Sequence, residues 1–199
     1  MSETTKCFFE TIGHHVCEDT GEEDVRKKAP FPSTRPDKFL GHGYYFWEDN
    51  LHLSKEWGGK IYHNRGKPYV VCEFSIACQS NEFYDLVGNR SHQKYILKIR
   101  DLLTKKMRSL HNWPIGKIID FLREANDSED PEFGIFKGMF PFSTVRAVDN
   151  SYSSSRDLTK FSRSQPNFTE LNPCYIICVI NINRVNLSPI EIVHASKGA

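Results

Sequence analysis

The sequence predicts a single α+β domain whose sheet is mostly antiparallel. The chain has 199 residues, about the size of one domain, and its 39% hydrophobic residues are enough to fill one core. Runs of strand-forming residues lie near both ends of the chain, and segments with helical periodicity lie between them. No internal repeat or linker divides the chain, so we expect residues 1–199 to form one domain.

The first half of the chain alternates between strand-like and helix-like segments. Runs of β-branched and aromatic residues favour strands, and three prolines within residues 29–37 favour a loop. Asn50 is typical of a helix N-cap, and the glycines at 58 and 59 are expected to end that helix. The expected elements are a strand over 7–16, a short helix ending near Ala29, a loop over 29–37, a strand over 43–47, a helix over 50–57 and a strand over 69–77.

The second half is expected to hold two amphipathic helices and two strands. Apolar residues recur every three or four positions over 91–110, which is the period of a helix with one buried face, and its other face is basic. A shorter helix follows Pro114. We expect strands over 144–148 and 175–182, the latter in the middle of the sheet because it is nearly all apolar, and one long surface loop over 151–173.

Charge and hydropathy exclude several classes of protein. The 26 Lys and Arg residues balance 25 Asp and Glu residues, which disfavours non-specific binding to DNA or RNA. The longest apolar runs are far shorter than the roughly 18 residues that span a bilayer. Met1–Lys6 also lacks the layout of a secretory signal, and five of the six cysteines lie in apolar runs, as reduced thiols do. We therefore expect a cytoplasmic protein that does not enter membranes.

The sequence predicts no metal site. His14, His15 and Cys17 stand close together in the chain, but they lack the paired short spacing of zinc ligands. Cys174 and Cys178 share one face of the expected last strand, yet they are about 13 Å apart along it, too far to bind one ion. No glycine-rich phosphate loop is present either.

The most informative segment of the chain is residues 39–57. Gly41 and Gly43 allow the backbone to come close to a ligand, and a strand of aromatic residues follows directly. Side chains alternate along a strand, so Tyr44 and Tyr45 face opposite sides and only one of them can line a given cleft. The same pattern also fits an aromatic core strand that is entered through a glycine turn.

Four segments of the chain resemble, in the same order, segments of the diphtheria-toxin-like ADP-ribosyltransferases, especially the catalytic domain of poly(ADP-ribose) polymerases and its smaller bacterial relatives. Residues 41–46 and the following Ser54-Lys55 resemble the family's Gly-x-Gly-x-Tyr-Phe segment and its Ser-Lys helix. The early strand with His14-His15, the strand over 67–76 and the segment 175–187 are similar to three further family strands. The resemblance implies an ADP-ribosyltransferase-like fold of split antiparallel sheets with flanking helices.

The resemblance also implies an activity. Such enzymes take NAD as a substrate, use no metal, and break the bond between nicotinamide and ribose while positive charge develops on the sugar. The resemblance implies that a first-strand histidine binds the adenosine ribose. His15 is preferred to His14 because His15-Val16-Cys17 is shaped like the family's His-Gly-Ser/Thr. It also implies that Tyr45 and Trp57 stack on nicotinamide and that Ser54 binds the carboxamide of nicotinamide. The remaining candidates, which would line the NAD site beside these residues, are Val16, Gly43 and Tyr44.

The closing strand departs from the family pattern. Polymer-forming members carry a glutamate there, but this chain has Ile176 at the corresponding position, and isoleucine can neither bind a hydroxyl nor take a proton. Chain elongation is therefore disfavoured. The remaining hypotheses are a mono-ADP-ribosyltransferase, a catalytically inactive module that binds NAD or ADP-ribose, and a structural or partner-binding protein without a dinucleotide site.

The expected acceptor of ADP-ribose is a protein or a nucleic acid. Family members recognise the acceptor with a segment before the closing strand, where this chain has Arg156, Lys160 and Arg163 among serines. Glu170 of the same segment could supply the missing acid if the segment folds back, and an ordinary solvated loop is the alternative. The resemblance also allows a neutralising partner, and the sequence indicates no oligomeric state.

Overall fold

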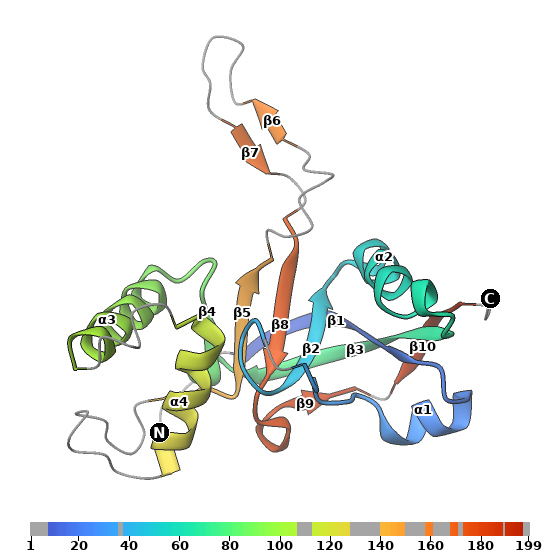
Figure 1. Cartoon of the computed structure of the whole chain (residues 1–199), viewed down its shortest axis with the longest axis horizontal. Coiled ribbons are helices and arrows are strands. Elements are labelled where there is room, and N and C mark those ends of the chain that lie inside the picture. Colours follow the sequence, from blue (N-terminus) through green and yellow to red (C-terminus); the bar gives the residue numbers. More distant parts are fainter. Residues whose placement is uncertain are drawn as a thin grey trace, which may run out of the picture.

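Eight strands form one sheet that is mostly antiparallel (Figure 1). This computed structural model describes residues 8–35, 38–106, 113–127, 140–149, 158–160, 168–170, 173–188 and 190–196. The strands of the sheet are β1 (Phe8–Glu18), β2 (Tyr44–Glu48), β3 (Tyr69–Gln79), β4 (Phe83–Asp85), β5 (Thr144–Val148), β8 (Tyr175–Val179), β9 (Asn186–Leu187) and β10 (Glu191–Ala195). Their order is β10-β3-β1-β2-β8-β5-β4, β9 pairs with β3, and among the described pairs only β4 and β5 run parallel.

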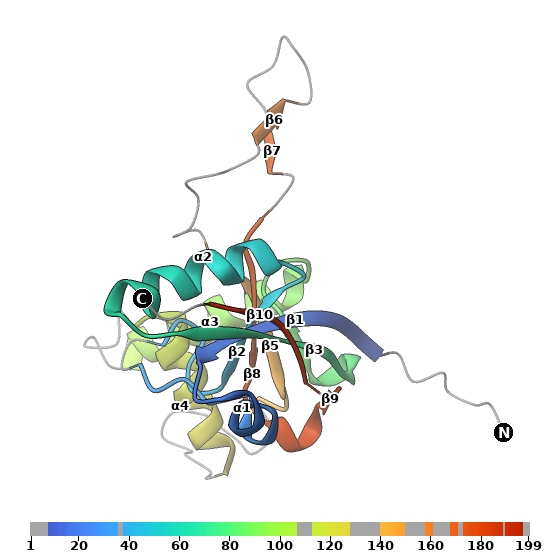
Figure 2. The ribbon, with the colours of Figure 1, turned by 90° about the vertical axis from the view of Figure 1, so that its right-hand side faces the viewer.

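Helices cover both faces of this sheet. The helices are α1 (Glu22–Lys28), α2 (Leu51–Ile61), α3 (Arg90–Lys106) and α4 (Ile115–Asp127), with short 3-10 turns over 63–65, 80–82 and 182–184. Side chains of α2, α3 and α4 pack on one face of the sheet, called here the first face, and form the first core with residues such as Val16 and Ile176. Val25 of α1 packs on the opposite, second face with residues such as Cys17 and Phe46. Figure 2 shows α2 lying along β1 and β3.

Helix α2 is longer than the sequence predicts. The Asn50 side chain caps it by accepting a hydrogen bond from the backbone N–H of Leu53 at 2.9 Å, as expected. The glycines at 58 and 59 do not end the helix, which continues to Ile61. A Cβ atom at Gly58 would lie 2.2 Å from the ring of Tyr69, so this glycine serves the close packing of α2 on β3 instead.

Several predicted boundaries differ from the structure. The segment predicted as one loop over 151–173 contains two described strands, β6 (Leu158–Lys160) and β7 (Phe168–Glu170), which pair with each other and which Figure 1 shows away from the main sheet. The last long strand ends at Val179, because the chain turns into a 3-10 turn at Ile182. The predicted helix over 91–110 is described only to Lys106, and its last residues lie outside the described ranges.

The sheet is also continuous, whereas split sheets were expected. Strand β2 pairs with β1 on one side and with β8 on the other, and it thereby joins the two halves through hydrogen bonds. The short strands β4, β9 and β10 add to the edges and were not predicted. Strands β4 and β9 have three and two residues, too few to show a periodicity. None of the described helices is both long and apolar enough to cross a membrane.

Candidate functional site

The two histidines of β1 face opposite sides of the sheet. Successive side chains of a strand alternate between its faces. Val16, two residues after His14, belongs to the first core, and Cys17, two residues after His15, belongs to the second core. The ring of Tyr45 packs against the first core. Only His14 therefore shares a sheet face with Tyr45 and with α2.

His15 is a fully satisfied structural histidine. Its Nδ1–H donates to the carbonyl oxygen of Tyr45 at 2.9 Å, and its Nε2 accepts a hydrogen bond from the backbone N–H of Phe31 at 3.1 Å. Its ring also packs at 5.6 Å from the ring of Phe46. Burial lowers the pKa of His15 to about 4, so the ring stays neutral. No ring nitrogen of His15 is left for a ligand, and the candidate histidine changes from His15 to His14.

His14 has one ring nitrogen without a partner. Its Nε2 lies 3.1 Å from Oε2 of Glu73, which stands opposite it on β3, and its side chain is only 4% exposed. A carboxylate can only accept a hydrogen bond, so Nε2 of His14 carries the proton. In the neutral ring, Nδ1 is then a hydrogen-bond acceptor. This Nδ1 is buried and has no hydrogen-bond partner within the described part of the chain. A buried unpaired nitrogen is costly, which marks this atom as a ligand contact to be tested.

Tyr45 holds the glycine turn that precedes its own strand. Its hydroxyl donates to the carbonyl oxygen of Gly41 at 2.7 Å and accepts from the N–H of Leu40 at 2.9 Å. Burial raises the pKa of this hydroxyl well above its usual range, so it remains protonated. Tyr44 packs against the second core, so of the two tyrosines only Tyr45 is on the face of His14.

The other predicted contacts of NAD serve the packing of the first face. Ser54 is fully buried, and its hydroxyl donates to the carbonyl oxygen of Asn50 at 2.8 Å. Trp57 is half-buried, and its ring meets Tyr62 edge-on at 6.0 Å. A Cβ atom at Gly43 would lie 2.6 Å from the carbonyl oxygen of Val179, so close approach of two strands is enough to require this glycine.

Ile176 lies in the same row of the first face as His14. Trp47 of β2 pairs with His14 on one side and with Ile176 on the other, and Glu73 pairs with His14 from β3. The row across four neighbouring strands is therefore Glu73, His14, Trp47 and Ile176. Ile176 is 7% exposed, which makes its place apolar and closed to water. Glu73 is the acid of this row, and two strands, β1 and β2, separate it from Ile176.

The predicted acceptor segment is described only in part. Arg156 and Arg163 lie outside the described residues. The backbones of Lys160 and Glu170 belong to β6 and β7, where Lys160 pairs with Phe168 and Glu170 with Leu158. Their side chains lie outside the description, so the proposed use of Glu170 as an acid stays a prediction.

Helix α4 fastens the glycine turn in front of β2. Asp120 of α4 accepts two hydrogen bonds from His42, one from its backbone N–H at 2.6 Å and one from Nδ1 at 2.8 Å. Arg123 donates to the carbonyl oxygen of His42 at 2.8 Å. Gly41 has a φ of 85°, and a Cβ atom there would lie 2.5 Å from a carboxylate oxygen of Asp120. Glycine is therefore required for Asp120 to reach this turn.

Replacing Gly116 with alanine is expected to lower the free energy of unfolding by about 1–3 kcal/mol. A Cβ atom there would lie 2.1 Å from the carbonyl oxygen of Lys38 and 2.8 Å from the nitrogen of Gly41, and backbone atoms cannot give way cheaply. Urea unfolding measures the effect. Gly59→Ala is the control, since its Cβ would meet no atom within 4 Å. Equal midpoints for Gly116→Ala and wild type would contradict the docking of the turn on α4.

Sequence reasoning missed Glu73 and the pair of His42 with Asp120. Glu73 is the one charged residue in strand β3, which is otherwise uncharged and mostly buried. A single charge in such a strand is the signal that could have identified it. Asp120 is 78 residues away from His42 in the chain. It lies within an ordinary amphipathic helix, and no local pattern of the sequence indicates that contact.

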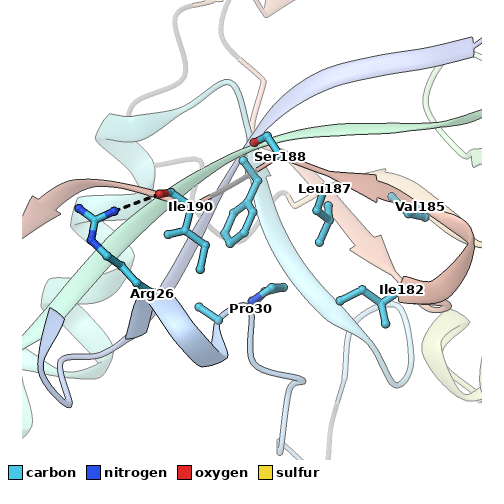
Figure 3. A pocket seen from close by; sticks show the side chains of 9 residues that line it. Arg26, Pro30, Ile182, Val185, Leu187, Ser188 and Ile190 are labelled. Carbon is cyan, nitrogen blue, oxygen red and sulfur yellow. Dashed lines mark hydrogen bonds between the residues drawn. The ribbon is translucent and has the colours of Figure 1, made fainter. Parts of the chain in front are cut away.

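A cavity of about 550 Å³ lies on the second face, and none of the predicted site residues is among the residues that line it (Figure 3). Its lining is mostly apolar and includes Phe74 of β3, Pro30, and Leu187 of β9. Arg26 also lines it, but its Nη1 donates to the carbonyl oxygen of Ile190 at 3.2 Å and its Nε donates to Glu22 at 2.8 Å. Because its guanidinium already makes these two hydrogen bonds, Arg26 does not single out this cavity as a ligand site.

Comparison with known proteins gave no further indication of a site. No protein-family model, curated protein or solved structure matches the chain. Within the described ranges, no three His, Cys, Asp or Glu side chains gather in a way that could hold a metal ion. The candidate site therefore rests on the geometry of the first face: His14 with Glu73, Tyr45, and Ser54 and Trp57 of α2.

Proposed function

We propose that this protein is an NAD-dependent mono-ADP-ribosyltransferase whose site lies on the first face of the sheet. In this proposal NAD is a substrate, a protein or nucleic acid is the acceptor, and nicotinamide is released. The fold would be that of the ADP-ribosyltransferases, and the protein would act in the cytoplasm. His14 takes the role that the sequence assigned to His15.

The arrangement of the four resembling segments supports this proposal. Their strands are β1, β2, β3 and β8, and in the sheet they are direct neighbours in the order β3-β1-β2-β8. Strands β1 and β2 bring His14 and Tyr45 to one face, and α2 packs on that same face with Ser54 and Trp57. Segments far apart in the chain thus meet where the resemblance requires a common site.

The observation that carries the proposal is the unpaired Nδ1 of His14. Burying an acceptor without a partner costs roughly 1–3 kcal/mol, which a ligand hydroxyl could recover by donating to it. The 2′- and 3′-hydroxyls of a ribose are such donors. Glu73 supports this role because it holds the opposite nitrogen at 3.1 Å and thereby keeps the lone pair on Nδ1. His15, with both nitrogens bonded, has no such capacity.

Ile176 limits the proposed chemistry to a single transfer. A buried isoleucine offers no hydrogen bond to a ribose hydroxyl and cannot activate a second ribose as an acceptor. The protein's contribution is then to bind and bend NAD so that the bond to nicotinamide can break. The same isoleucine favours one alternative function, a module that binds NAD or ADP-ribose without turning it over.

Two measurements on the purified protein test the proposal. NAD at a hundredfold excess over its dissociation constant should stabilise the protein by about 2.7 kcal/mol in thermal unfolding. Release of nicotinamide should accompany this stabilisation, and stabilisation without release would favour the binding module. Tyr45→Leu should abolish release because stacking is lost, whereas Tyr45→Phe should retain it. No stabilisation by NAD, or equal release by Tyr45→Leu and wild type, would contradict the proposal.

A further inference from the structure

His42 is a second histidine with one nitrogen held by a carboxylate and the other free. Its Nδ1 lies 2.8 Å from Oδ2 of Asp120, and its side chain is 61% exposed. A carboxylate only accepts hydrogen bonds, so Nδ1 of His42 carries the proton. The lone pair of the neutral ring is then on Nε2. In the described ranges no hydrogen bond to Nε2 is present. A base oriented by a carboxylate, with its second nitrogen exposed, is the arrangement of a general base.

The ring of His42 is held in place more firmly than a surface side chain needs. Asp120 also accepts from the backbone N–H of His42 at 2.6 Å, and Arg123 binds its carbonyl oxygen at 2.8 Å. Gly41 and Gly116 leave just enough room for α4 to reach the turn. The backbone and the imidazole are thus fixed together, which is the preorganisation that proton transfer requires.

The turn stands at the Tyr45 end of the proposed site. The residue before His42 accepts the hydrogen bond of the Tyr45 hydroxyl at 2.7 Å. In the proposed function, Tyr45 stacks on nicotinamide, so the turn borders the end of NAD at which the bond breaks. His14 lies on β1, one strand away, where it would hold the other end. With Ile176 at this position, β8 offers the reaction no carboxylate.

We propose that His42, oriented by Asp120, is the general base that deprotonates the acceptor, an inference that rests on the proposed function. The acceptor atom of an O–H, N–H or S–H group forms a bond to the anomeric carbon of the nicotinamide ribose. The bond from this carbon to nicotinamide breaks, and its electron pair stays on the nitrogen of neutral nicotinamide. The acceptor proton moves to Nε2 of His42 and passes to water afterwards. Water itself is the simplest acceptor and gives free ADP-ribose.

The test measures hydrolysis of NAD by the full chain, with water as the acceptor. The fluorescence of etheno-NAD follows the loss of nicotinamide. His42→Ala should lower kcat by about 100-fold or more, as expected for the loss of a general base, while the dissociation constant of NAD stays within about threefold. Added imidazole should restore much of the lost rate, because the exposed position of His42 leaves room for it. A merely structural role would not be rescued in this way.

His52 offers a matched control. It lies on α2, is 83% exposed, and pairs with Glu56 at 3.5 Å, so it is also a surface histidine beside a carboxylate. His52→Ala should keep the wild-type rate. If His42→Ala retains a rate within threefold of wild type, or loses activity that imidazole does not restore, the inference about His42 is overturned. The proposed function is not affected by that result. Should wild type bind NAD without releasing nicotinamide, both the proposed function and this inference fail.

Discussion

His14→Phe is expected to weaken the binding of NAD by about 10- to 100-fold. Phenylalanine keeps a ring of similar size on the first face but removes the Nδ1 acceptor that the ribose would use. Losing one hydrogen bond to a buried group costs roughly 1–3 kcal/mol, which corresponds to this range of affinities. Isothermal titration calorimetry of the variant and of wild type measures the difference.

His52→Phe is the control for this prediction, because it removes an exposed histidine whose partner is a surface carboxylate. Its affinity for NAD should match that of wild type. Glu73→Gln should weaken binding less than His14→Phe does, since the amide oxygen can still accept from Nε2 of His14. Wild-type affinity in a folded His14→Phe protein would remove His14 from the site.

The burial of His15 is expected to make the free energy of unfolding fall strongly at acid pH. Burial lowers the pKa of His15 from its usual value of 6.5 to about 4, so below pH 6.5 the unfolded chain binds a proton that the folded protein does not. The free energy of unfolding therefore falls as the pH drops from 6.5 towards 4, by about 3 kcal/mol through this group alone. Above pH 6.5 the contribution is fully present.

Urea unfolding between pH 7 and pH 4 measures this loss. His15→Asn replaces the buried ring with a carboxamide that does not titrate. The variant should be less stable than wild type at pH 7 because it loses the packing of the ring. Its free energy of unfolding should, however, fall with acid by about 3 kcal/mol less than that of wild type. His52→Asn, which changes an exposed histidine, should follow the wild-type curve. Parallel curves for His15→Asn and wild type would contradict the burial of a neutral His15.

The sequence could predict the long elements because their patterns are local. The strand over 69–77, the helix after Asn50 and the apolar strand from Tyr175 are all present, within a few residues of their predicted ends. Gly58 shows the limit of such rules. A glycine near a helix end usually indicates a stop, but here packing against Tyr69 requires it inside the helix, and that neighbour is visible only in the fold.

The choice between His14 and His15 could not be made from the sequence. Alternation along a strand predicts that the two face opposite sides, but the side that becomes the site depends on which partners the fold supplies. Phe31 comes from a loop and fills the last free position of His15. Glu73 comes from β3 and leaves one nitrogen of His14 free. Both contacts join distant parts of the chain, as does the contact of Asp120 with His42.

The most direct test of the proposed site follows the ring nitrogens of both β1 histidines by nitrogen-15 NMR during a titration with NAD. In the free protein, His14 is expected to carry its proton on Nε2, with an unbonded Nδ1, and NAD should move the Nδ1 resonance as this nitrogen gains a hydrogen bond. The resonances of His15 should stay in place. If a saturating amount of NAD moves the resonance of neither His14 nitrogen, or moves those of His15 instead, His14 does not bind NAD.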